Sequence, residues 1–94
     1  MIKSVALSKR ALKELRKVPR HVTVKLQAWV EGVENDGLHE VQKMPGFHDE
    51  PLKGKRRGQR AIRLSKAYRA IYRIEKDTNN EEFVHIEEVT KHEY

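Results

Sequence analysis

The spacing of the apolar residues changes once along the chain, and this change constrains the fold more than any other feature. Over residues 8–36, apolar side chains recur every three or four positions, which is the period of an amphipathic helix. From residue 59 onward they alternate with polar side chains, which is the period of a strand with one buried face. Helices followed by strands predict an α+β fold in which the helices cover one face of a sheet.

The first part of the chain is expected to form one strand and two helices. The strand is expected at residues 2–7 and the helices at residues 8–17 and 20–35. Ser8 can cap the first helix, Pro19 separates the two, and Gly37 ends the second. Trp29 has apolar neighbours at helical spacing, so we expect it in the core rather than stacked on a base. Because the connection between the helices is short, we expect them to pack as an antiparallel hairpin.

Residues 38–58 show no sustained period, and so long a connection in a small domain is uncommon and often functional. A short strand near residues 38–41 is the one element expected within it. Three strands follow, separated by predicted turns at residues 65–67 and 77–80, and short links favour an antiparallel meander. We therefore expect residues 1–94 to form a single domain, with the N-terminal strand and the two-helix hairpin packed on a small antiparallel sheet.

The composition excludes several classes of protein. The chain has no cysteine, which excludes disulfides, thiolate metal sites and cysteine nucleophiles. No stretch approaches the roughly 20 apolar residues of a membrane span, and the first residues lack the apolar run of a secretory signal, so we expect a cytoplasmic protein. The five histidines form no pair with metal-ligand spacing. The cluster His48-Asp49-Glu50 is too weak a signal for a metal site, so neither a metal nor another cofactor is expected.

Positive charge is concentrated in the middle of the chain. The net charge is +6, but residues 37–73 carry ten basic and three acidic side chains, and residues 74–94 carry two basic and seven acidic ones. Between Pro51 and Arg73 there are nine Lys or Arg and no Asp or Glu. So one-sided a block favours a polyanion or an acidic protein as partner, with a solvated surface that keeps the protein soluble as the alternative.

Arginines on the predicted strands are candidates for phosphate binding, because a guanidinium binds two oxygens at once and keeps its charge. Arg69 and Arg73 share one face of their strand, whereas Arg60 has the parity of the core residues. The alternative is that some of these arginines pair across the sheet with Glu87 or Glu88.

The last residues of the chain bring a histidine and a tyrosine after the final strand. His92 can act as a general acid or base near neutral pH. Tyr94 can do so where neighbouring cations lower its pKa, or it can stack on a base. Taken alone, the segment also has the features of a frayed terminus.

Four segments together resemble the RelE and HigB toxins of bacterial toxin–antitoxin systems. The segments are Pro51-Leu52-Lys53-Gly54, Arg60-Ala61-Ile62-Arg63-Leu64, Tyr68-Arg69-Ala70-Ile71-Tyr72 and Val89-Thr90-Lys91-His92-Glu93-Tyr94. The order of strand, two helices, long basic loop, strand meander and basic-aromatic tail is theirs as well. The resemblance covers essentially the whole chain, and its most specific parts are the Tyr-Arg-x-x-Tyr strand and the Val-x-Lys-His-x-Tyr tail taken together.

The resemblance implies a metal-independent endoribonuclease that binds in the ribosomal A site, cleaves mRNA and thereby inhibits translation. The RNA 2′-hydroxyl would attack the adjacent phosphorus and leave a 2′,3′-cyclic phosphate and a 5′-hydroxyl. Arg69 is implied as the transition-state arginine, and the other implied catalytic residues are Lys53, His92 and Tyr94. The residues implied to hold ribosomal or messenger RNA are Lys55, Arg56, Arg57, Arg60, Arg63, Lys66, Arg73 and Lys91. A cognate antitoxin is the expected protein partner, in a toxin–antitoxin hetero-oligomer.

The chain departs from RelE at one point, and two other functions stay open. RelE carries two lysines on the strand before its Tyr-Arg motif, whereas the residues near Gln59 and Ala61 are not lysine, so loop lysines would have to substitute. A ParE-like toxin of the same fold would inhibit DNA gyrase by binding and would cut no RNA. A non-catalytic RNA-binding module would lose affinity and change its salt dependence when Arg69 is replaced.

Overall fold

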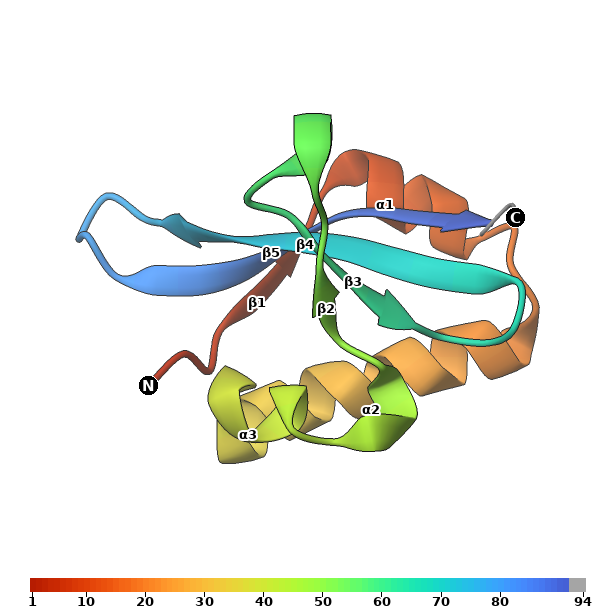
Figure 1. Cartoon of the computed structure of the whole chain (residues 1–94), viewed down its shortest axis with the longest axis horizontal. Coiled ribbons are helices and arrows are strands. Elements are labelled where there is room, and N and C mark those ends of the chain that lie inside the picture. Colours follow the sequence, from red (N-terminus) through yellow and green to blue (C-terminus); the bar gives the residue numbers. More distant parts are fainter. Residues whose placement is uncertain (92–94) are drawn as a thin grey trace.

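Five strands form one mixed sheet in the order β1-β5-β4-β3-β2 (Figure 1). This computed structural model describes residues 1–91. The strands are β1 Val5–Leu7, β2 Glu50–Pro51, β3 Arg60–Arg63, β4 Tyr68–Lys76 and β5 Glu82–Lys91. The predicted meander is confirmed in β3, β4 and β5, and β2 extends it at one edge. β1 pairs with β5 in parallel, so the sheet is mixed rather than wholly antiparallel.

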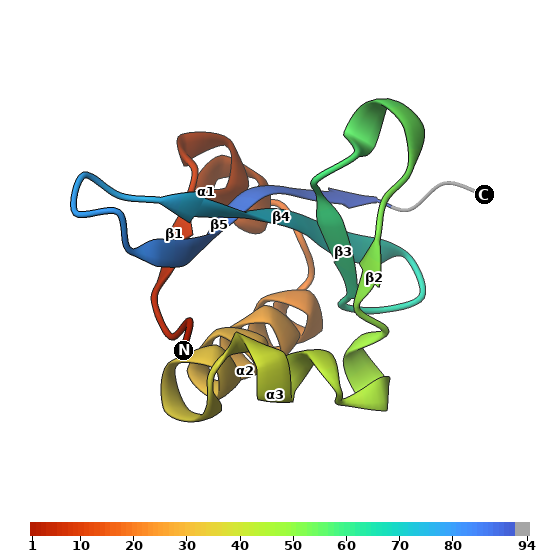
Figure 2. The same ribbon diagram turned by 60° about the vertical axis from the view of Figure 1, so that its left-hand side comes forward.

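The helices take different places around this sheet (Figure 2). They are α1 Lys9–Leu15, α2 Arg20–Asp36 and α3 Leu38–Gln42, and the 3-10 turns are η1 Pro45–Phe47 and η2 Gly54–Arg56. α2 lies across one face of the sheet with α3 packed against it, whereas α1 lies beside β5. The predicted α+β class is confirmed, but α1 and α2 do not form the expected hairpin. No helix in residues 1–91 has both the length and the apolar composition needed to cross a membrane.

α1 lies at the sheet edge because β5 is longer than its parallel neighbour. β1 pairs only with residues 84–86, so the next residues of β5 have no strand on that side. Ser8 Oγ, which also caps α1, donates to the carbonyl of Glu87 at 2.7 Å, and the N–H of Val89 donates to Glu14 Oε1 at 2.9 Å. Since a buried backbone group without a partner is costly, these bonds favour α1 beside β5 over packing against α2.

The short strand expected near residues 38–41 is wrong, because this stretch forms α3. Leu38 and Val41 are both buried, and a spacing of three residues puts them on the same side of a helical turn. Gly37 separates α2 from α3 with a φ of 89°, a conformation that favours glycine. α3 has only five residues, which is too short for a helical period to stand out in the sequence.

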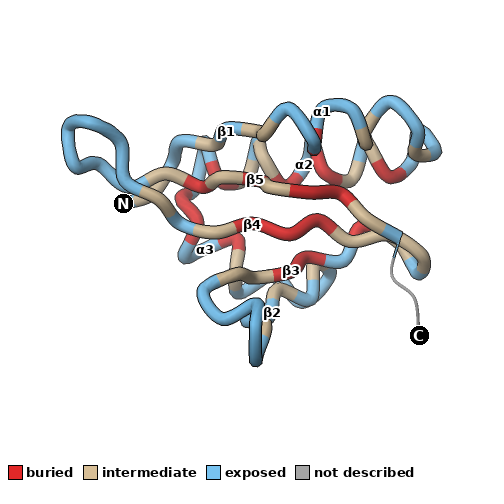
Figure 3. The backbone as a smooth tube through the Cα atoms, turned by 90° about the horizontal axis from the view of Figure 1, so that it is seen from above, coloured by how far each residue is buried: buried red, intermediate tan, exposed pale blue. Residues whose placement is uncertain are grey.

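The core lies between α2 and the face of the sheet that it covers, which we call the inner face. Trp29 is fully buried there, and its ring centroid lies 5.0 Å from that of Tyr72, which confirms its predicted place in the core. The strand residues that meet α2 share one parity along each strand and include Ile62, Leu64, Ala70, Val84 and Ile86. Residues of the opposite parity form the outer face, which Figure 3 views with α2 behind the strands.

Replacing Leu26 tests the packing of α2 on the sheet. Leu26 is buried in this helix, whereas Val24 on the same helix is 51% exposed. We expect Leu26→Ala to lower the free energy of unfolding by about 2–5 kcal/mol, because it removes apolar contacts and leaves a cavity. We expect Val24→Ala to change it by no more than about 0.5 kcal/mol. Urea unfolding followed by the fluorescence of Trp29, the only tryptophan, gives both values. Equal losses in the two variants would contradict this packing.

Candidate active site

The outer face of the sheet places two arginines directly opposite each other. Arg63 on β3 is in register with Arg69 on β4, and Arg69 is in register with Thr90 on β5. Like charges opposite each other on neighbouring strands are destabilising. Neither arginine makes a salt bridge within residues 1–91. A bound anion would offset this repulsion, so the pair is suited to hold a phosphate.

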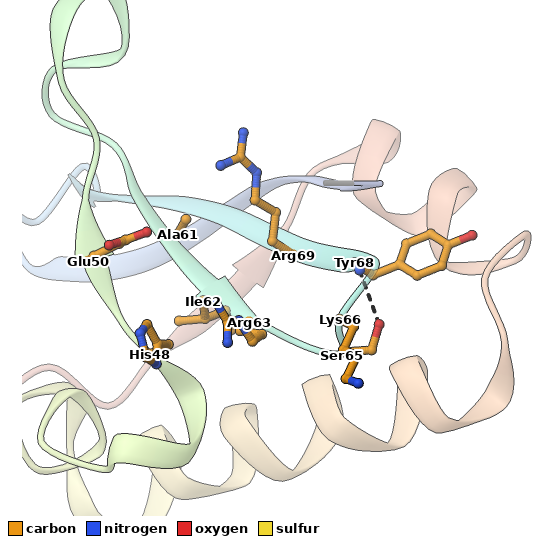
Figure 4. A pocket seen from close by; sticks show the side chains of 9 residues that line it. All are labelled: His48, Glu50, Ala61, Ile62, Arg63, Ser65, Lys66, Tyr68 and Arg69. Atoms are coloured by element: carbon orange, nitrogen blue, oxygen red, sulfur yellow. Dashed lines mark hydrogen bonds between the residues drawn. The ribbon is translucent and has the colours of Figure 1, made fainter. Parts of the chain in front are cut away.

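Arg69 has a second feature that points to a ligand. Its Nε is buried and has no hydrogen-bond partner in the described part of the chain. Figure 4 shows its guanidinium rising from β4 away from α2. A buried donor without a partner is costly, so its presence in a folded protein calls for an explanation. An anion bound at this position would supply the missing acceptor.

A small pocket opens beside Arg69, between β2, β3 and the turn that joins β3 to β4 (Figure 4). The polar and aromatic side chains that line it include His48, Glu50, Arg63, Lys66, Tyr68 and Arg69. Its volume is about 40 Å³, whereas pockets that enclose a small molecule measure about 300–1,000 Å³. The pocket therefore suits a chemical group laid across the surface, such as a backbone phosphate, better than an enclosed metabolite.

Glu50 and His48 line this pocket, although the sequence analysis selected neither as a site residue. Glu50 is in register with Ala61, which puts it on the outer face of the edge strand β2. A carboxylate and an imidazole are common general acids and bases, and here they share a pocket with Arg69. The available signal was the run of three polar residues before the basic loop. No group of three His, Asp or Glu in residues 1–91 is arranged to hold a metal ion.

The four predicted catalytic residues have different places in the structure. Arg69 lines the pocket, whereas Lys53 is an exposed residue at the start of the basic loop between β2 and β3. Figures 1 and 4 show this loop rising on the side of the sheet toward which Arg69 points. His92 and Tyr94 lie outside the described residues. Of the two that the structure describes, Arg69 lines the pocket and Lys53 does not.

The predicted RNA-binding residues fall into two groups. Three arginines already pair with a carboxylate within 4 Å, and these are Arg56, Arg60 and Arg73. The others make no salt bridge within residues 1–91, and these are Lys55, Arg57, Arg63, Lys66 and Lys91. Members of the second group have their charge available for a polyanion, whereas each arginine of the first group would first have to leave its carboxylate.

A β-bulge in β5 supplies two of these carboxylates. The register between β4 and β5 shifts after Ile71, at the consecutive residues Glu87 and Glu88. Arg73 Nε donates to Glu87 Oε1 at 2.8 Å, and Gln59 Nε2 donates to the same oxygen at 3.2 Å. Burial raises the pKa of Glu87, but these hydrogen bonds and the charge of Arg73 outweigh burial, so the pKa is lowered. Glu87 is therefore held as an anion that keeps Arg73 in place.

Solved structures with this fold are known, although no family model and no curated protein sequence matches the chain. YafQ from E. coli strain BL21(DE3) has a TM-score of 0.71 and 16% identity, over 94% of this chain and 91% of that one. The YoeB/ParE toxin from Agrobacterium tumefaciens has a TM-score of 0.68 and 14% identity, over 96% of this chain and 99% of that one. A chain of the toxin–antitoxin complex RelBE2 from Mycobacterium tuberculosis has a TM-score of 0.58 and 22% identity, over 98% of this chain and 100% of that one. The chain therefore has the fold of these proteins, as the resemblance in its sequence predicts.

The lowered pKa of Glu87 makes a prediction about stability and pH. A group whose pKa is lower in the folded state stabilises the fold above its ordinary pKa, and loses this effect as the pH falls through the lowered value. We expect Glu87→Gln to be less stable than the parent near pH 7, and the difference to shrink as the pH falls below the ordinary pKa of glutamate and the parent becomes protonated. Urea unfolding across this range measures it. Glu31→Gln, an exposed change on α2, is the control, and a difference independent of pH would contradict the assignment.

Proposed function

We propose that the protein is the toxin of a type II toxin–antitoxin pair, and that it cleaves mRNA in the ribosomal A site without a metal ion. The single observation that carries this proposal is the juxtaposition of Arg63 and Arg69, with no carboxylate bound to either within residues 1–91, beside a pocket that contains Glu50 and His48. The toxin fold supports the class of protein. The resemblance in the Tyr-Arg-x-x-Tyr strand and the tail supports the reaction.

The proposed reaction needs one charge stabilised and two protons moved. As the 2′-hydroxyl attacks phosphorus, negative charge develops on the phosphate oxygens, and Arg69 would stabilise it with donors already in place. The 2′-hydroxyl must lose a proton and the leaving 5′-oxygen must gain one. Glu50 and His48 are candidates for these transfers because they share the pocket with Arg69. Lys53, His92 and Tyr94 are the candidates that the resemblance implies, and binding in the ribosome would hold the RNA in line for attack.

A cognate antitoxin is the proposed partner. Two of the similar structures, the E. coli DinJ-YafQ complex and RelBE2, are toxin–antitoxin complexes by name. This chain carries a net charge of +6, so acidic side chains of an antitoxin could neutralise the outer face, or a helix could lie across it. Covering that face would also block access to Arg69.

Cleavage is favoured over the two other functions by the chemistry of the pocket. A ParE-like gyrase inhibitor, or a module that only binds RNA, does not need a carboxylate and an imidazole beside a pair of arginines. An exposed Glu50 would even weaken the binding of a phosphate by charge repulsion. Its presence in the pocket is therefore better explained by proton transfer than by affinity.

Replacing Arg69 is the direct test of this function. We expect Arg69→Gln to lower mRNA cleavage on programmed ribosomes by about 10²–10³-fold, because it removes the charge that stabilises the transition state. We also expect it to abolish growth arrest when the protein is expressed. Primer extension on translated mRNA measures cleavage, and circular dichroism verifies the fold.

Lys76→Gln is the matched control, because it removes one positive charge at the other end of the same strand, β4. We expect it to cleave like the parent. Full cleavage by Arg69→Gln would refute the role of this arginine. Inhibition of DNA supercoiling by gyrase, with no RNA cut by the parent protein, would replace the proposal with the ParE-like function.

A further inference from the structure

A network centred on a buried carboxylate joins four parts of the chain on the inner side of β2 and β3. The side chain of Asp49 is 0% exposed. It accepts hydrogen bonds from Arg60 Nε at 2.7 Å and from the hydroxyl of Tyr72 at 2.6 Å. Gln42 Nε2 of α3 donates to the same hydroxyl at 3.0 Å. The four side chains therefore tie α3, the segment before β2, and the strands β3 and β4 to one point.

Tyr72 and Arg60 keep their protons in this network. Burial raises the pKa of Tyr72 far above its ordinary value, and the hydrogen bond to Asp49 raises it further, so the phenol stays protonated and keeps donating. Burial alone would lower the pKa of Arg60, but its hydrogen bond to Asp49 and the charge of that residue raise it. A buried charge is tolerated only when it is paired and hydrogen-bonded, and Asp49 meets both conditions.

Asp49 stands between the two pocket residues His48 and Glu50. Side chains of neighbouring residues in an extended chain point to opposite faces. A carboxylate fixed on the inner side therefore directs Glu50 to the outer face, where it is in register with Ala61. His48 has a φ of 50°, a left-handed conformation that residues other than glycine rarely adopt. Such a conformation persists only where surrounding contacts hold it, and the contacts of Asp49 lie one residue away.

We propose that Asp49 and Arg60 are positioning residues, which hold the segment 48–50 so that His48 and Glu50 line the pocket beside Arg69. In this arrangement Arg60 acts through Asp49 and does not bind RNA, in contrast to the role that the sequence resemblance implies. The kinetic consequences of this positioning rest on the proposed function, whereas the structural consequences do not.

The kinetic test separates positioning from RNA binding. Asp49→Asn keeps the size of the side chain but removes the charge that pairs with Arg60, and Arg60→Gln removes the partner. We expect each to lower kcat for mRNA cleavage by about 10- to 100-fold, with KM nearly unchanged, because misplaced catalytic groups slow the chemical step. We expect the pH dependence of kcat to shift in both variants. Arg57→Gln, which removes an exposed loop cation, is expected to raise KM with kcat nearly unchanged.

Glu75→Gln is the matched control, because it also turns a carboxylate into an amide and weakens a pair, the one with His85 at 3.3 Å at the other end of β4. We expect kcat and KM of this variant to equal those of the parent. If Arg60→Gln raises KM alone, as Arg57→Gln is expected to do, Arg60 binds RNA and the proposal is overturned. A kcat equal to that of the parent in Asp49→Asn would overturn it as well.

A second measurement needs no RNA, so it tests the positioning even if the parent protein cleaves nothing. In nuclear magnetic resonance spectra of the full chain, Asp49→Asn is expected to shift the ring signals of His48 and to speed hydrogen exchange at the amide of Glu50, with α1 unaffected. Unchanged signals at both residues in the folded variant would overturn the proposal. Should Asp49→Asn fail to fold, Tyr72→Phe removes only the hydroxyl from the network, and the same shifts, smaller in size, are expected of it.

Discussion

Tyr72 makes the two contacts on which the rest of the structure depends. Its ring packs against Trp29 and so joins the central strand of the sheet to α2. Its hydroxyl donates to the buried carboxylate of Asp49 and so joins the same strand to the segment that enters β2. The hydrophobic core and the polar network therefore meet in one side chain. One aromatic side chain thus links the packing of α2 on the sheet to the segment at the edge of the pocket.

The inner and outer faces of the sheet differ in how completely their charged groups are paired. On the inner side, each charged group of the network has a partner at hydrogen-bond distance. On the outer face, Arg73 and Arg56 have glutamates as partners, whereas Arg63 and Arg69 are opposite each other with no salt bridge in the described residues. The rest of the fold must offset this local repulsion. Strain that the rest of a fold must offset is typical of binding and catalytic sites.

The order of the helices and strands could be predicted from local patterns, but their arrangement in space only in part. Alternation along the strands put Arg69 and Arg73 on one face and gave Arg60 the parity of the core residues, and both predictions agree with the register of β3, β4 and β5. The expected helix hairpin is wrong because the place of α1 depends on contacts with a strand distant in the sequence. β1 is too short to cover β5, and Ser8 and Glu14 hydrogen-bond to the edge of β5 that is left unpaired. α3 was missed because a helix of five residues hardly shows a period.

The sequence by itself determined the fold class, the basic block and the face that Arg69 shares with Arg73, because hydrophobic period, charge and strand parity are properties of neighbouring residues. Only the tertiary structure decided which side chains surround that arginine. Glu50 and His48 line the pocket, and Arg60 pairs with Asp49 on the inner side, because β2 pairs with β3 in one register and a buried carboxylate anchors the chain before it. Such a choice depends on contacts between residues distant in the chain, and no local pattern encodes them.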